Sequence, residues 1–418
     1  MFLAPLSLRI FGALSILALA LTPADLKLKP NEHKTFSKLV SDYFTAFDEQ
    51  KGIQEKLQKF IDLIETTDKR LKNQQILSSV SDWEEVFRLV TAERLKQTIK
   101  IKKGEVAIAK VKHHTGRDVV FAYCLPKTYS TKSVLPLILT VPDAGEDPSA
   151  HLNAHWNDAA IREGAILVAV QMGQDSKVWG TFGSPEAPGG AFTVMFALGV
   201  VQREFAVDCN RTFLAGAGEG FSAAEATAGA FPHCYAGVIG IGNVSSGSPA
   251  NLGNFRNLPT LLLKGGEGAK AIESKIAELG FGNCSVLPEG GVAEVWAWIG
   301  KTVRQAYPAQ ISFAPTSDYA RRTHWISLEG VQVSENPRID AKVDRAANTI
   351  TIDAQKVSDL VIYLNDVLVD LDKPVRFLVN GTTQEQTVAR NGVEMVKNQY
   401  AGGDWGRVFT CYVTQNIP

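Results

Sequence analysis

Apolar residues in the middle of the chain come in short, nearly continuous runs, which is typical of parallel strands buried on both faces of a sheet. Five such runs occupy residues 135–141, 165–170, 212–215, 237–241 and 260–263. The segments between and after them predict helices near residues 149–163, 190–205, 219–230, 268–279 and 292–306. This alternation predicts a doubly wound, mostly parallel α/β sheet, whose ligand crevice lies at the carboxyl ends of the strands.

The pattern before this region is different. From residue 33 to about residue 100 the chain is rich in Lys, Glu, Gln and Leu, and apolar residues recur on one helical face in three stretches. Three amphipathic helices are therefore expected. We expect their apolar stripes to be buried on a neighbouring domain; the alternative is a module that recruits a partner. Residues 106–111 and 119–125 flank a polar turn and predict a β-hairpin.

After Pro308 the pattern changes again. Short β-like runs at residues 345–353, 360–364 and 376–381 are separated by Asn, Asp, Gly and Pro. They predict a small all-β module from about residue 323 to residue 389, to which the tail adds a strand. We favour a structural module over a carbohydrate- or surface-binding one, because Trp325 and Tyr363 alone do not form an aromatic platform.

The first residues have the pattern of an export signal. A single cation, Arg9, precedes the apolar run 10–21, and small residues follow up to Ala24. This arrangement is typical of a secretory signal peptide, and the run is shorter than the ~20 residues that a membrane span needs. We therefore expect an exported protein (periplasmic, cell-surface or extracellular) without a membrane span in the mature chain.

The central feature of the sequence is the segment 211–222. An apolar run breaks into alternating glycines and continues as an Ala-rich helical stretch. Strand, sharp turn and helix are the context of the nucleophile elbow, whose motif is G-x-S-x-G. Here the motif is Gly216-Ala217-Gly218-Glu219-Gly220, so glycine occupies the place of the nucleophilic serine.

Residues 214–220, together with residues 231–243, resemble the central part of secreted α/β-hydrolases of the esterase and polyhydroxybutyrate-depolymerase type. The resemblance extends roughly over residues 106–307 and implies an α/β-hydrolase fold. With it the chain divides into a signal peptide (1–24), a helical segment (25–104), an α/β-hydrolase-like domain (105–308) and a C-terminal β-rich module (309–418).

The resemblance also implies where a nucleophile, an acid, a histidine and oxyanion donors belong. Gly218 is at the nucleophile position, and Glu267 is the only carboxylate at the acid position. The histidine position is empty, since no histidine lies between His233 and His324. The oxyanion loop is matched by residues 141–145, where Asp143 places negative charge at a site that stabilises anions. Conventional serine hydrolysis is therefore disfavoured.

Two residues are candidates for unconventional chemistry. Ser222 lies one turn into the elbow helix, and Glu219 lies in its first turn; for both, a structural role is favoured. Asp143, Glu146, Asp147 and Glu219, with His151 and His155, could form a divalent-metal site. We favour the alternative that Asp147 caps a helix and that the histidines are packing groups, and predict no metal and no cofactor.

Charge and cysteine content narrow the function classes. The formal net charge of −1 gives no basic footprint for nucleic acid. The five cysteines are scattered, and buried free thiols are favoured over disulfides. The leading hypothesis is a pseudo-enzyme that binds an unknown ligand or protein partner at Asp143, Ala144, Gly145, Gly218 and Glu219. The alternatives are a carboxylic ester or peptide hydrolase that uses Glu219 or Ser222, and a structural cell-envelope protein.

Overall fold

The computed structural model describes residues 26–112, 116–184, 186–289 and 291–417. The predicted signal peptide lies outside these residues. Within them, none of the helices combines the length and the hydropathy that crossing a membrane requires. All five cysteines are free thiols, and Cys124, Cys209 and Cys411 are buried.

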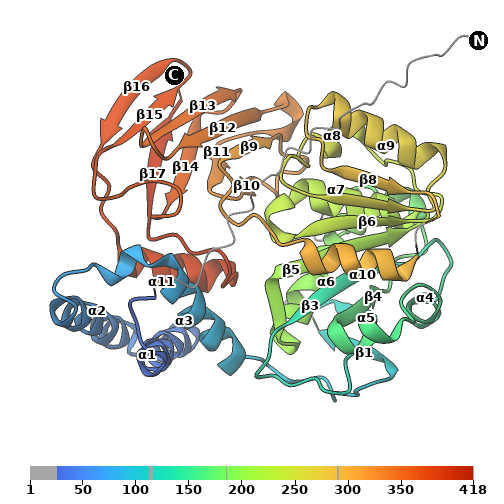
Figure 1. Cartoon of the computed structure of the whole chain (residues 1–418), viewed down its shortest axis with the longest axis horizontal. Coiled ribbons are helices and arrows are strands. Elements are labelled where there is room, and N and C mark those ends of the chain that lie inside the picture. The colour runs from blue at the N-terminus through green and yellow to red at the C-terminus, as the bar shows by residue number, and fades with distance from the viewer. Residues whose placement is uncertain (1–25, 113–115, 185, 290, 418) are drawn as a thin grey trace, which may run out of the picture.

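An eight-stranded sheet forms the middle of the chain, with the strand order β1-β2-β4-β3-β5-β6-β7-β8 (Figure 1). The strands β3 to β8 are parallel to one another, and β2 runs antiparallel to both β1 and β4. This arrangement confirms the predicted hairpin and the predicted mostly parallel sheet. The strands are β1 (Val106–Lys112), β2 (Asp118–Cys124), β3 (Leu135–Val141), β4 (Ile166–Val170), β5 (Val207–Ala217), β6 (Gly237–Ile241), β7 (Thr260–Leu263) and β8 (Cys284–Leu287).

Helices cover both faces of this sheet, because successive residues of a buried strand point to opposite faces. In β3, Leu137 and Leu139 belong to one hydrophobic core and Ile138 belongs to the other. The first core contains residues of α6 (Gly190–Glu204), α7 (Gly220–Ala230), α8 (Pro249–Leu252) and α9 (Glu267–Glu278). The second core contains residues of α4 (Pro148–His155), α5 (Ala159–Gly164) and α10 (Val292–Lys301).

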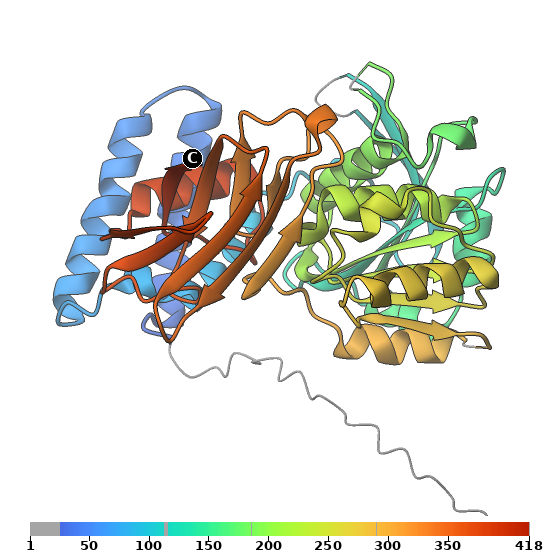
Figure 2. The ribbon, with the colours of Figure 1, turned by 90° about the horizontal axis from the view of Figure 1, so that it is seen from above.

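The three predicted N-terminal helices are α1 (Pro30–Asp48), α2 (Ile53–Arg70) and α3 (Val80–Glu93). Their apolar stripes are buried on one another and on the C-terminal helix α11 (Gly392–Gly402), through Met395 and Val396. The prediction that the stripes are buried is thus confirmed. Their main partner comes from the far end of the chain. Figures 1 and 2 show these helices on the side of the molecule opposite the eight-stranded sheet.

Two further sheets follow the α/β region, and alternate residues of their strands face a shared core. Helix α11 adds a helix to the predicted strands; Asn391 caps it by accepting hydrogen bonds from the Val393 and Glu394 amides. One sheet consists of β10 (Arg322–Thr323), β11 (Ile326–Glu329), β14 (Asp359–Leu364) and β17 (Cys411–Asn416). The other consists of β16 (Thr382–Gln386), β15 (Val375–Val379), β13 (Thr349–Gln355), β12 (Arg338–Asp344) and β9 (Gln310–Phe313).

A buried set of charged and aromatic residues, here called the junction cluster, lies between the sheet and the C-terminal part. It consists of Arg304, Asp404, Arg407, His233 and His324. Arg304 donates to both carboxylate oxygens of Asp404, at 2.6 and 2.8 Å, and to the carbonyl of His233. Burial opposes the ionisation of Asp404, but Arg304 outweighs it, so the pKa of Asp404 is lowered. The cluster lies near the amino ends of the strands, since His233 precedes β6.

Candidate functional site

The predicted strand–turn–helix elbow is present. Strand β5 ends at Ala217, Gly218 adopts a left-handed conformation with φ of 48°, and α7 begins at Gly220. A side chain on Gly220 would overlap the backbone carbonyls of Val141 and Pro142, so the helix begins close against the end of β3. Glycine is therefore required at this turn, by the left-handed backbone at Gly218 and by the close backbone contact at Gly220.

The carboxylate of Asp143 occupies the space next to Gly218 that a side chain would fill. A Cβ atom placed on Gly218 would overlap Cγ and both carboxylate oxygens of Asp143. One of these oxygens, Oδ1, accepts hydrogen bonds from the amides of Glu219 and Ala144, both at 2.8 Å. In G-x-S-x-G hydrolases the oxyanion donors are the amide after the nucleophile and an amide of the loop after β3. The carboxylate of Asp143 thus occupies both donors.

The acid and histidine positions contain no triad partners. Glu267, after β7, is an exposed carboxylate paired with Lys270. His233 and His324 are buried in the junction cluster, where burial lowers the pKa of both imidazoles, that of His324 to about 3. Among the described residues, no histidine forms a hydrogen bond or ion pair with Asp143, Glu219 or Ser222. Triad members need be adjacent only in space, so His113 and His114 are further candidates for the histidine, and both lie outside the described residues.

Among the described residues, no basic side chain forms a hydrogen bond or ion pair with either candidate for unconventional chemistry, Ser222 or Glu219. The Ser222 hydroxyl donates to the backbone carbonyl of Glu219 at 2.8 Å, which is an intrahelical contact. Glu219 is exposed, and within the described part of the chain its carboxylate has no hydrogen-bond partner. A serine becomes a nucleophile when an adjacent base takes its proton, and this geometry provides none.

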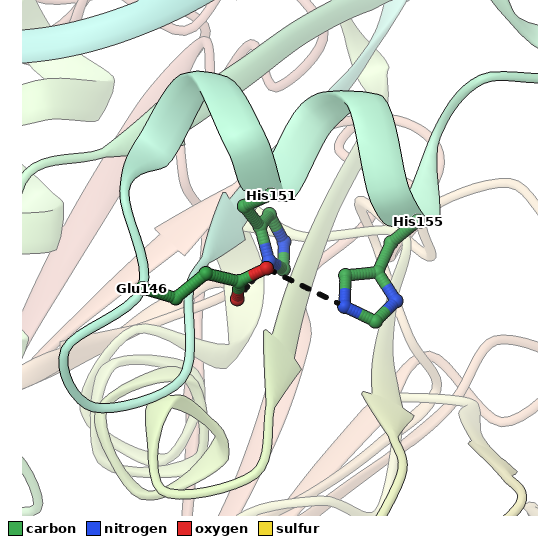
Figure 3. Close-up of side chains that lie close together, drawn as sticks. All are labelled: Glu146, His151 and His155. Atoms are coloured by element: carbon green, nitrogen blue, oxygen red, sulfur yellow. Dashed lines mark hydrogen bonds and ion pairs between the residues drawn. The ribbon is translucent and has the colours of Figure 1, made fainter.

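A series of hydrogen bonds runs from β3 through α4 to the Asp143 loop, and Figure 3 shows its middle part, the contact between His151 and Glu146. His151 Nε2 lies 2.9 Å from the Thr140 hydroxyl, and His151 Nδ1 lies 2.7 Å from Glu146 Oε2. The same carboxylate oxygen accepts the amide of Asp143 at 3.1 Å. Hydroxyl, imidazole and carboxylate follow the order of a catalytic triad, but Thr140 and His151 are fully buried. This series of hydrogen bonds therefore holds the Asp143 loop in place, and its buried hydroxyl and imidazole are not accessible to a substrate.

Only some of the residues that the sequence analysis considered as a divalent-metal site lie close together. Asp147 caps α4 by accepting the amides of Ser149 and Ala150, both at 2.9 Å, as the capping interpretation predicted. Glu146, His151 and His155 do come together, with one ligand atom of each within 4.8 Å of the others. Burial lowers the pKa of His151, and the carboxylate of Glu146 opposes this effect.

One buried residue of the elbow helix was missed by sequence reasoning. Glu225 is fully buried and accepts the Ser246 hydroxyl at 2.7 Å and the Gly247 amide at 2.6 Å, so it holds the loop after β6 against α7. Burial raises the pKa of Glu225 to about 7. The signal for it was in the sequence, since Glu225 is the only charged residue between residues 220 and 232.

Two cavities lie away from the elbow. One, of about 680 Å³, is lined by the edge strand β1 and by cations that include Lys96, Lys100 and Arg203. A smaller one, of about 250 Å³, lies at the end of β4 beside Gln171. Neither is lined by Asp143, Gly218 or Glu219.

Comparison with known proteins gives structural neighbours only. No protein-family model matches the chain, and no curated protein matches it. Among solved structures, a thermostable esterase is 17% identical over 48% of this chain and 64% of its own, with a TM-score of 0.40. The poly(3-hydroxybutyrate) depolymerase LpqC of Bordetella parapertussis is 14% identical over 52% of this chain and 97% of its own, with a TM-score of 0.38. The serine hydrolase FphF of Staphylococcus aureus, which binds fluorophosphonates, is 11% identical over 47% of this chain and 99% of its own, with a TM-score of 0.37.

These neighbours include an esterase and a depolymerase, the types of α/β-hydrolase that residues 214–220 and 231–243 resemble. Their low identities and TM-scores carry no argument about what this chain does.

Proposed function

We propose that this chain is an exported α/β-hydrolase-fold protein that has lost Ser-His-Asp catalysis and acts as a ligand- or partner-binding pseudo-enzyme. The observation that carries the proposal is the position of Asp143. Its carboxylate takes the room of a side chain on Gly218 and accepts the amides of Glu219 and Ala144.

This arrangement opposes acyl transfer in two ways. The reaction needs a nucleophile, and Gly218 has no side chain to supply one. It also needs empty donors that stabilise the developing oxyanion, a contribution of roughly 2.7–4 kcal/mol for one donor in a serine protease. A carboxylate that already accepts these amides competes with the oxyanion and repels it.

The same features leave a surface for binding. Asp143, Ala144, Gly145 and Glu219 are exposed at the carboxyl ends of the strands, where ligands of open α/β sheets bind. Two exposed carboxylates favour a cationic or hydrogen-bond-donating ligand over an anionic one. Export rests on the pattern of residues 1–24.

Activity-based labelling tests the loss of catalysis. Purified protein is treated with a fluorophosphonate probe and assayed for short-chain aryl ester hydrolysis, beside the variants Ser222→Ala and Glu219→Gln and an active esterase as positive control. We expect neither labelling nor turnover. Labelling that disappears in Ser222→Ala would make the protein a serine hydrolase with a displaced nucleophile, and turnover that disappears in Glu219→Gln would assign carboxylate chemistry.

Export is tested separately. N-terminal sequencing of protein recovered from outside the cytoplasm is expected to begin near residue 25. Intact protein that begins at Met1 and stays in the cytoplasm would contradict this part of the proposal.

A further inference from the structure

The strongest unexplained feature is a gap between His155 and Glu146. His155 Nε2 lies 3.7 Å from Glu146 Oε1, which is too long for a hydrogen bond. Among the described residues, no hydrogen bond satisfies either ring nitrogen of His155. The two groups nevertheless face one another across this gap (Figure 3). A positively charged species between them would satisfy both.

The separations fit two ligands of one metal ion. Zinc binds nitrogen and carboxylate oxygen at about 2.0–2.2 Å in tetrahedral geometry, which places two ligand atoms about 3.3 Å apart. His151 Nδ1 lies 2.7 Å from Glu146 Oε2, and His155 Nε2 lies 3.7 Å from the other carboxylate oxygen, Oε1. One ligand atom from each of the three residues lies within 4.8 Å of the others. These values lie on either side of about 3.3 Å, so a small rotation of the partly exposed Glu146 and His155 side chains brings the three atoms to one ion.

The more buried imidazole is already oriented as a ligand. The Thr140 hydroxyl lies 2.9 Å from His151 Nε2, so it fixes the ring and leaves Nδ1 directed at Glu146. Metal-binding histidines commonly use their second nitrogen in this way.

We propose that Glu146, His151 and His155 bind one Zn²⁺ ion, through a Glu146 carboxylate oxygen, His151 Nδ1 and His155 Nε2. Two imidazoles with one carboxylate suit zinc better than magnesium or calcium, which take oxygen ligands. In the bound form His151 is the neutral tautomer with its proton on Nε2, which donates to the Thr140 hydroxyl, and the lone pair of Nδ1 binds the metal in place of the present hydrogen bond with Glu146. The Glu146 and His155 side chains are 22% and 33% exposed, so solvent water reaches the fourth ligand position.

The site does not depend on the proposed function, because it uses neither Gly218 nor Asp143 as a ligand. It is nevertheless connected to the elbow, since Glu146 Oε2 accepts the amide of Asp143, whose carboxylate lies over Gly218.

Zinc titration tests the proposal. Tag-free chain is stripped with a chelator, and Zn²⁺ is titrated in by calorimetry, with Co²⁺ substitution followed by its visible absorption. We expect one equivalent of metal per chain and the intense absorption of four-coordinate Co²⁺. His155→Ala and Glu146→Gln are expected to raise the Kd at least tenfold, and Thr140→Val, which removes only the orienting hydroxyl, about 10–100-fold.

The control is Glu163→Gln, which removes an exposed carboxylate of the neighbouring helix α5 and should leave the Kd unchanged. His155 is the primary target because its side chain is partly exposed and its loss leaves the fold intact. Absence of stoichiometric binding would overturn the proposal. So would binding that stays within twofold of the original protein in His155→Ala or in Glu146→Gln.

Discussion

The eight-stranded sheet differs between its amino edge, where the strands begin, and its carboxyl edge, where they end: charged side chains are mostly buried at the first and exposed at the second. At the amino edge, the junction cluster buries two arginines and two imidazoles and leaves the carboxylate that pairs with Arg304, that of Asp404, 17% exposed. At the carboxyl edge, where this fold places its chemistry, the elbow retains its turn but has a glycine and an intruding carboxylate in place of a triad. The densest group of titratable residues therefore lies at the opposite edge from the one at which we propose that a ligand binds.

The largest effect is expected from breaking the junction cluster. In Asp404→Ala the guanidinium of Arg304, whose side chain is 2% exposed, loses its counter-charge. Leaving a buried charge unpaired costs about 3–5 kcal/mol, so the free energy of unfolding in urea should fall by that amount.

The matched control is Glu385→Ala, which breaks the exposed Arg376–Glu385 pair and should change the free energy of unfolding by no more than about 0.5 kcal/mol. Equal effects of the two substitutions would show that the junction cluster is not a stabilising element.

At the carboxyl edge, the buried Glu225 predicts a dependence of stability on pH. Burial raises its pKa from 4.5 to about 7 in the folded protein, so between these values the folded state holds a proton that the unfolded state has lost. Its contribution is complete below pH 4.5 and decreases as the pH rises towards 7. The decrease amounts to at most about 3.5 kcal/mol, at roughly 1.4 kcal/mol per pKa unit.

The measurement is urea unfolding at pH 5 and pH 8 for the original protein and for Glu225→Gln. The variant removes the titrating group, so the difference in unfolding free energy between the two pH values should become smaller by this contribution. An identical pH dependence in both proteins would be inconsistent with a protonated Glu225.

A smaller effect sharpens the description of the elbow. Gly218→Ala places a side chain at a left-handed residue, which costs about 1–2 kcal/mol, and also displaces the carboxylate of Asp143. When Gly218→Ala is made in the Asp143→Ala variant, the carboxylate is already absent, so only the cost of the left-handed backbone remains. A double-mutant cycle on unfolding free energies should therefore give a coupling of about 1 kcal/mol, and a coupling near zero would place the carboxylate elsewhere.

The smallest effect is expected for the thiols. Burial raises the pKa of Cys209, and that of Cys234 to about 11, and both lie near the junction cluster. A disulfide reagent at pH 8 should label the buried Cys209 only after denaturation, and the half-buried Cys234 slowly in the native protein. Rapid labelling of the native protein would show that the amino edge opens to solvent.

The sheet, the hairpin, the N-terminal helices and the elbow were predictable because each depends on a periodic local pattern. Asp143 was also placed correctly beside the oxyanion donors, since the loop after β3 follows from the strand order. That its carboxylate covers Gly218 was not predictable, because it depends on the conformation of that loop. The pairing of His151 with Thr140 joins a helix to the adjacent strand, and no spacing rule reveals such a contact.

Helix α11 was not predicted, because turn residues surround a short amphipathic stretch. The partner of the N-terminal helices could therefore not be identified either.

The packing of α1, α2 and α3 on α11 has a consequence for biosynthesis. These helices are synthesised long before their partner α11, since Tyr400 donates to Asp48 across 352 residues. Until α11 is made, the part of their apolar surface that it covers stays exposed, and exposed apolar surface on an incomplete chain promotes aggregation. We therefore expect the nascent chain to need a holding chaperone, and truncations that remove α11 to yield insoluble protein even though the eight-stranded sheet is intact.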